Sequence, residues 1–169
     1  MSMNRSAGES EGRLFNSTLE TSVRTLTVLD AMSGRTCDLT LLTWLDYLVV
    51  HTGDVGGPAS LHPPLPYRTG ELLVRRPAIE RGLVMLRRLR LVDLVTDADG
   101  MGYYATEDAY SLIRMMRSTY AGALRSRAAW LAEFHAGMSR EELEQLMSEK
   151  LGAWSTEFSS VRQGGEARA

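Results

Sequence analysis

Apolar residues recur at helical spacing over the first half of the chain and predict three helices. The first spans residues 17–32, where Ser17 and Glu20 have the spacing of a capping box and apolar positions follow three residues apart. The second spans residues 38–51 and has an aspartate in its N-cap position. The third begins at Pro77, because proline is favoured in the first turn of a helix.

The third predicted helix has two distinct faces. Its expected buried stripe consists of Ile79, Leu83, Leu86 and Leu89. The opposite, outward face contains Arg81, Val84 and Arg88. Apolar residues among outward arginines, such as Val84 and the adjacent Met85, suit a protein-binding surface better than a surface that contacts phosphates.

The hydrophobic period changes after the third helix. Apolar and polar residues alternate over positions 91–96 and 101–105, which predicts two strands. Asp99 with Gly100 supplies the turn of a β-hairpin between them. A long helix is then expected over residues 106–135, and at 1.5 Å per residue it would extend for roughly 40 Å.

The order of these elements predicts a mainly α fold with a small β-hairpin. Three helices followed by a hairpin is the order of a winged helix, to which the long helix is an addition. Residues 14–135 are therefore expected to form one winged-helix-like domain, and residues 138–158 a short acidic helical appendage that begins with a second capping box. The polar ends, residues 1–13 and 159–169, are expected to be disordered.

A segment rich in proline and glycine, residues 52–71, interrupts this domain. Its prolines exclude a regular helix or a central strand. Long connections inside a compact domain are uncommon and tend to be functional or disordered. The apolar residues Leu61, Leu65 and Tyr67 favour an ordered loop that packs on something.

Charge is distributed unevenly along the 169 residues, although the formal net charge is only -2. Between positions 68 and 90 there are seven arginines against two glutamates, a local charge of +5. A basic surface of this kind could approach nucleic acid, and its candidate contacts are Arg75, Arg76, Arg81, Arg87 and Arg88. The long helix offers a second basic strip, with Arg114, Arg117 and Arg125.

No local motif indicates catalysis, so we expect a non-enzymatic protein without a cofactor. His51, His62 and Asp54 have donor atoms that suit zinc or iron, but their spacing matches no compact metal-binding signature. The glycines near residue 55 lack a phosphate-binding lysine, and there is no nucleophile elbow. The single cysteine, Cys37, is expected to be a small buried residue in a reducing compartment. No segment has the length of a membrane span or the pattern of a signal peptide, and the expected location is cytoplasmic.

Three segments carry a resemblance to a known family. They are FNSTLE at positions 15–20, WLDYLVVHTGDVGGPASLHPPLPYRTGELLVRR at 44–76 and IERGLVMLRRLRLV at 79–92. Together the region over approximately residues 14–135 resembles the middle-component family of bacterial ABC-three component systems, which is similar to the small third subunit of Lamassu-type antiphage defence. The HTGDVGGPASLHPP block is the specific part, whereas IERGLVML alone would fit many winged helices.

The resemblance implies an accessory, somewhat kleisin-like subunit of a cytoplasmic DNA-sensing complex. Its implied partners are an SMC-like ATPase and an effector, often a nuclease, with double-stranded DNA as a further candidate partner and no membrane. The matching loop is the expected intersubunit contact, through Asp54, Pro58, Leu61, His62, Pro63, Pro64, Tyr67 and Arg68, to which the residue analysis adds Val84 and Met85. The alternative hypothesis is a stand-alone winged-helix transcription regulator that reads DNA with the +5 window.

Overall fold

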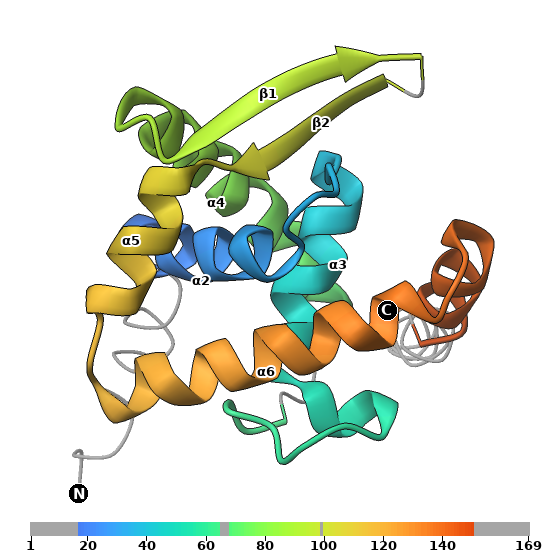
Figure 1. Cartoon of the computed structure of the whole chain (residues 1–169). Coiled ribbons are helices and arrows are strands. Elements are labelled where there is room, and N and C mark those ends of the chain that lie inside the picture. Colours follow the sequence, from blue (N-terminus) through green and yellow to red (C-terminus); the bar gives the residue numbers. More distant parts are fainter. Residues whose placement is uncertain (1–16, 65–67, 99, 151–169) are drawn as a thin grey trace, which may run out of the picture.

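The computed structural model describes residues 17–64, 68–98 and 100–150, with the side chains of positions 68 and 69 left out (Figure 1). Helices surround a common core and one antiparallel hairpin projects from it, so the predicted winged-helix-like, mainly α fold is confirmed. The elements are α2 (Thr18–Ala31), α3 (Leu39–Val50), the short 3-10 helix η1 (Thr52–Val55), α4 (Arg68–Arg88), β1 (Val92–Asp97), β2 (Gly100–Ala105), α5 (Glu107–Met115) and α6 (Thr119–Ala136), followed by a C-terminal helix over residues 140–150. No helix among the described residues is long and apolar enough to cross a membrane.

The first two helices begin where local sequence predicts. The Ser17 hydroxyl accepts a hydrogen bond from the backbone N–H of Glu20 at 3.2 Å, and the Asp38 carboxylate accepts one from Leu41 at 2.7 Å. Each bond satisfies one of the N–H groups that a helix start leaves without an intrahelical acceptor. Both predicted N-caps are therefore confirmed.

Helix α4 corrects the predicted third helix and shortens the predicted loop. It starts at Arg68, nine residues before the expected start, and Pro77 lies inside it. Proline removes one intrahelical hydrogen bond, and here packing holds the helix together across it, because Leu72 and Arg75 are buried on the same side as Ile79. The C-terminal end of the predicted buried stripe is also wrong, since Leu89 is 59% exposed.

The core lies where α2, α3 and α4 cross beneath the hairpin (Figure 1). Helix α4 comes very close to α2, because a Cβ atom at Gly82 would meet the Ser22 hydroxyl at 2.8 Å. The contact fixes which face of α4 points outward. The largest fully buried apolar side chains are Leu26, Leu29, Met32, Leu42, Leu45, Tyr47, Leu48, Ile79, Leu83, Ile113 and Leu124.

The predicted hairpin is confirmed, but Gly100, which was expected in its turn, begins strand β2 and pairs with Asp97. The hairpin also has a third partner that was not predicted. Its strands pair from Val92 with Ala105 to Asp97 with Gly100. On the other side of β2, Cys37 and Tyr103 exchange two backbone hydrogen bonds of 2.9 and 2.8 Å. The hairpin is thus tied to the α2–α3 connection, and Cys37 is fully buried at the junction.

The long helix predicted after the hairpin is two helices. The chain leaves helical geometry at Met116, whose ψ is 112°, and the Ser118 hydroxyl then caps α6 by accepting from Ala121 at 3.1 Å. The Arg125 guanidinium donates to the carbonyls of Ile113 and Met116 at 3.2 and 2.8 Å. Because these carbonyls lie at the end of α5, Arg125 stabilises the break instead of joining a basic strip.

The C-terminal helix begins with the predicted capping box. Ser139 donates its N–H to the Glu142 carboxylate at 2.7 Å, and Glu142 donates its own to the Ser139 hydroxyl at 3.1 Å. Leu143 and Met147 face the core, while the acidic side chains face outward. The predicted disordered ends, and residues 151–158 of the predicted appendage, lie outside the described part of the chain.

Candidate functional site

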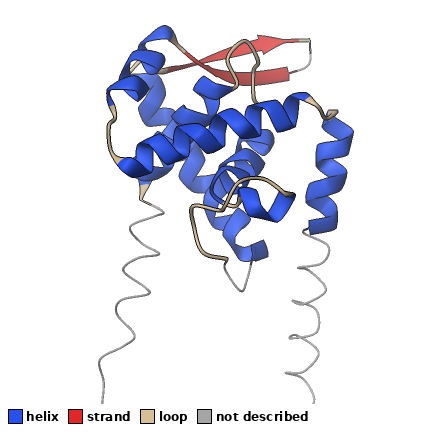
Figure 2. Ribbon diagram, turned by 60° about the horizontal axis from the view of Figure 1, so that its bottom comes forward, coloured by secondary structure: helices blue, strands red, loops and turns tan. Residues whose placement is uncertain are grey.

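The loop that follows α3 is held by its own backbone. The Thr52 hydroxyl donates to Pro58 O at 2.7 Å, and the N–H groups of Leu61 and His62 both donate to Val50 O, at 3.0 and 3.1 Å. Figure 2 brings this loop to the front, where it lies across the helices. The bonds close residues 52–62 into a compact loop with fixed ends.

Helix α6 contacts the loop through several residues, among them Arg127 and Trp130. The Arg127 guanidinium donates to Ala59 O at 3.0 and 3.2 Å. Gly57 lies against the Trp130 ring so closely that a Cβ atom would come within 2.6 Å of it. The contact with Trp130 explains why residue 57 is glycine. Residue 56 is glycine for another reason, because its φ is 77° and only glycine adopts such a backbone readily.

Side chains predicted to contact a partner subunit have partners inside the chain. The Tyr47 hydroxyl donates to Asp54 at 2.5 Å, and His62 Nε2 lies 2.9 Å from the Tyr120 hydroxyl. Burial and the nearby charge of Arg24 lower the pKa of His62 to about 4, so this ring is neutral at pH 7. Asp54 and His62 therefore take part in contacts that fold the loop, and their role in partner contact stays a prediction.

The remaining loop candidates lie in different environments. Leu61 packs against the core and Pro58 is half-buried, whereas Pro63 and Pro64 are exposed. Tyr67 and the Arg68 side chain lie outside the described residues. The two exposed prolines are the most accessible of the described loop candidates, and the role of all of them in partner contact stays a prediction.

A buried ionic network connects the three helices of the core. Asp46 of α3 accepts from Arg24 of α2 at 2.8 and 3.1 Å, and from Arg75 of α4 at 2.5 Å. All three side chains are at most 2% exposed. Burial raises the pKa of Asp46, but the two guanidinium groups lower it by more, so this carboxyl stays ionised.

Glu71 and His51 extend the network toward the loop. Glu71 accepts from Arg75 Nε at 3.1 Å and lies 3.5 Å from His51 Nε2. Burial acts to raise the pKa of Glu71, but His51 and Arg75 together lower it to about 2. Arg75, expected on a DNA-binding surface, is instead buried in this network, and that expectation is corrected. Among the described residues no three His, Cys, Asp or Glu side chains are placed to hold a metal ion.

The exposed side of α4 is the part of the described structure that best fits a binding surface. Leu73, Val74 and Val84 are 74%, 59% and 53% exposed, so α4 presents three large apolar side chains to solvent. Met85 is half-buried at the margin. We define the α4 outer face by the exposed residues from position 73 onward, which are Leu73, Val74, Arg76, Pro77, Glu80, Arg81, Val84, Arg87 and Arg88.

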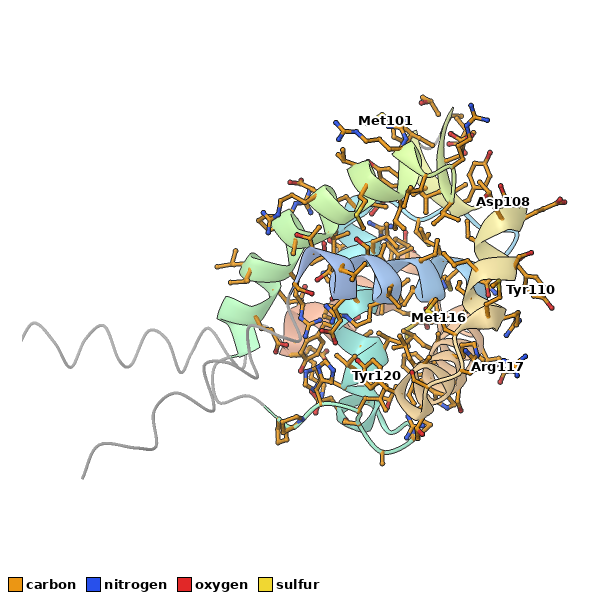
Figure 3. All side chains as sticks on the ribbon, turned by 90° about the vertical axis from the view of Figure 1, so that its left-hand side faces the viewer. Met101, Asp108, Tyr110, Met116, Arg117 and Tyr120 are labelled. Carbon is orange, nitrogen blue, oxygen red and sulfur yellow. The ribbon has the colours of Figure 1, made fainter. Side chains whose placement is uncertain are left out.

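Two further candidate arginines lie elsewhere. Arg114 of α5 stacks 4.5 Å from the Tyr110 ring centre and lies 3.8 Å from Asp30. Arg117 is exposed in the link between α5 and α6, and Figure 3 shows it with Tyr110 on the side of the molecule away from α4. The predicted basic strip through Arg125 therefore does not exist, because Arg125 binds backbone carbonyls.

Comparison with known proteins gives one match. The family model described as ABC-three component (ABC-3C) system Middle Component 2 matches residues 14–157. No curated protein and no solved structure matches the chain. The matched region extends beyond residue 135, where the resemblance was expected to end, and thus includes the C-terminal helix.

Proposed function

We propose, since the chain belongs to the middle component 2 family of ABC-three component systems, that it is a non-catalytic adaptor that docks on an SMC-like ATPase and couples it to an effector. Membership in a system of several components implies partner subunits. The adaptor role, the ATPase and the effector are our proposal.

The α4 outer face carries this proposal. Leu73, Val74 and Val84 expose apolar surface that a soluble helix ordinarily buries, and arginines surround them. Interface cores are depleted in charged residues as a class, whereas arginine, methionine and aromatic residues are enriched at interfaces. A few residues of an interface supply most of its binding energy. The face is rigid, because α4 is fixed by the Gly82 contact and the buried network.

The nature of the assembly rests on the sequence resemblance to the third subunit of Lamassu-type systems. On that basis we propose a cytoplasmic antiphage complex whose effector is a nuclease. Contact with double-stranded DNA within that assembly is proposed for the exposed Arg114 and Arg117, which do not belong to α4.

Coexpression with the other two components of the system tests the docking surface. An affinity tag on this chain should recover the ATPase, and Val84→Asp should reduce the recovery at least tenfold, because it places a charge in the apolar part of the face. Met115→Asp is the matched control, since Met115 is 74% exposed on α5, and should leave recovery unchanged. Failure to recover the ATPase with the native chain, or equal loss with both variants, contradicts the proposal.

A stand-alone winged-helix regulator is the second candidate, and the exposed arginines of α4 next to the hairpin favour it. It requires sequence-specific DNA binding by the isolated protein, with strong dependence on salt. Arg81→Ala or Arg88→Ala should then weaken binding. An isolated chain that shifts no DNA at low salt excludes this role.

A further inference from the structure

Three of the four apolar residues of the α4 outer face, all but Val74, form a ridge. Successive helix residues are rotated by about 100°, which places Leu73, Pro77 and Val84 within about 40° of one another around the axis. All three are exposed. From the first to the last the ridge rises by about 16 Å, or three helical turns. A partner helix of about three turns would cover it.

Positive charge borders this ridge on both sides. By the same rotation Arg76 and Arg87 lie on one side, and Arg81 and Arg88 on the other. Glu80 is the one acidic residue of the α4 outer face. The face therefore presents an apolar centre between two rows of cations.

These cations are not neutralised within the described part of the protein. No carboxylate of the described residues lies within salt-bridge distance of Arg81, Arg87 or Arg88. The charges of Arg24 and Arg75, by contrast, are fully paired in the core. The charge of the outer face thus remains available to an acidic partner.

The end of α4 adds a further cation at a conformational cost. Arg90 has a φ of 60°, and backbone bonds from Arg90 to Arg87 O and from Leu91 to Leu86 O, both 3.0 Å, form the helix ending that glycine usually occupies. A non-glycine residue in this conformation costs about 1 kcal/mol or more. The chain therefore keeps an exposed guanidinium next to the α4 outer face although the backbone favours glycine.

We infer that the partner segment that docks on the α4 outer face is an acidic amphipathic helix, which packs its apolar side on the Leu73–Val84 ridge and its carboxylates against the flanking arginines. The inference rests on the proposed docking function and specifies the chemistry of the partner. A facing helix satisfies both observations, since its apolar stripe covers the ridge and acids at its edges pair with both rows.

Duplex DNA fits the same face less well. Phosphates and base edges need hydrogen-bond donors or acceptors along the most outward line of the helix. That line is occupied by Leu73, Pro77 and Val84, which offer none from their side chains. The arginines stand beside this line, where they would meet carboxylates at the edges of a packed helix.

Site-specific crosslinking in the full-length chain identifies the docked segment. A photoreactive phenylalanine analogue in place of Val84, coexpressed with the other two components, should crosslink to one ATPase segment identified by mass spectrometry. We expect that segment to have apolar residues at spacings of three and four with glutamate or aspartate between them. A crosslink to DNA, or to a segment without acids, overturns the inference.

Charge exchange supplies the decisive measurement. Arg81→Glu with Arg88→Glu should weaken ATPase binding at least tenfold, and the reverse exchange of acids in the crosslinked segment should restore it. Arg117→Glu, an exposed arginine away from α4, is the matched control and should bind normally. Because Arg81, Arg88 and Arg117 are all exposed, the unfolding temperature of the double variant and of the control should equal that of the native chain. If Val84→Asp abolishes binding while the charge reversal has no effect, docking stands and the acidic helix is wrong.

Discussion

Replacement of Glu71 by glutamine measures how strongly the buried network stabilises the fold. Glutamine keeps the shape and an oxygen that can accept from Arg75 but removes the charge. The environment lowers the pKa of Glu71 from 4.5 to about 2, and one pKa unit corresponds to about 1.4 kcal/mol. Glu71→Gln should therefore lower the free energy of unfolding at pH 7 by about 3 kcal/mol.

The sign of the pH dependence distinguishes this charge effect from simple loss of packing. The folded state holds the Glu71 carboxyl ionised to lower pH than the unfolded state, so its contribution is fully present above pH 4.5 and is lost as the pH falls toward 2. The difference between the native chain and Glu71→Gln should shrink over that range. Urea unfolding followed by circular dichroism, repeated between pH 2.5 and 7, measures it.

Glu80→Gln on the exposed side of α4 is the matched control, and its free energy of unfolding should stay within about 0.5 kcal/mol of the native value. A Glu71→Gln difference that is the same at every pH would refute the reasoning, because packing does not titrate. A difference below about 1 kcal/mol at pH 7 would show that solvent screens the network more than its burial indicates.

Three other positions give independent tests. Gly57→Ala should destabilise the protein by about 1–3 kcal/mol in thermal unfolding, because its Cβ would meet the Trp130 ring at 2.6 Å, whereas Gly70→Ala, with nothing within 4 Å, should be neutral or stabilising. Arg90→Gly should raise the free energy of unfolding by about 1 kcal/mol, since it relieves a φ of 60°, and no gain in urea unfolding would contradict that strain. Burial raises the pKa of Cys37 to about 12. A thiol-reactive disulfide reagent at pH 8 should therefore modify Cys37 only as fast as the chain unfolds, and rapid modification of the native protein would be inconsistent with the structure.

Sequence patterns predicted the elements that depend on neighbouring residues. The caps at Ser17 and Asp38, the box at Ser139 and the hairpin are all local, and each was found where expected, although Gly100 lies in β2 and not in the turn. The predictions failed where distant contacts decide. Pro77 was taken as a helix start because proline is common there, but burial of residues before it extends α4 by more than two turns.

The break between α5 and α6 was missed for the same kind of reason. It depends on Arg125, which reaches back twelve residues to Ile113 O, and no helical period reveals such a bond. The buried network did leave a signal in the sequence. Asp46 is the only charged residue between Leu39 and Val50, and a lone acid in so apolar a helix requires a buried cation. Which arginines supply it could not be read without the fold.

The fixed loop after α3 changes what its unusual sequence means. Gly57, the Thr52 hydroxyl and the carbonyls of Pro58 and Ala59 all meet specific atoms, so these surface positions should tolerate replacement poorly. A scan of substitutions along the chain should therefore find few tolerated replacements in residues 52–62, although this loop lies on the surface. Across homologues the block would identify relatives by how they fold, while the residues that distinguish one partner from another would vary along α4.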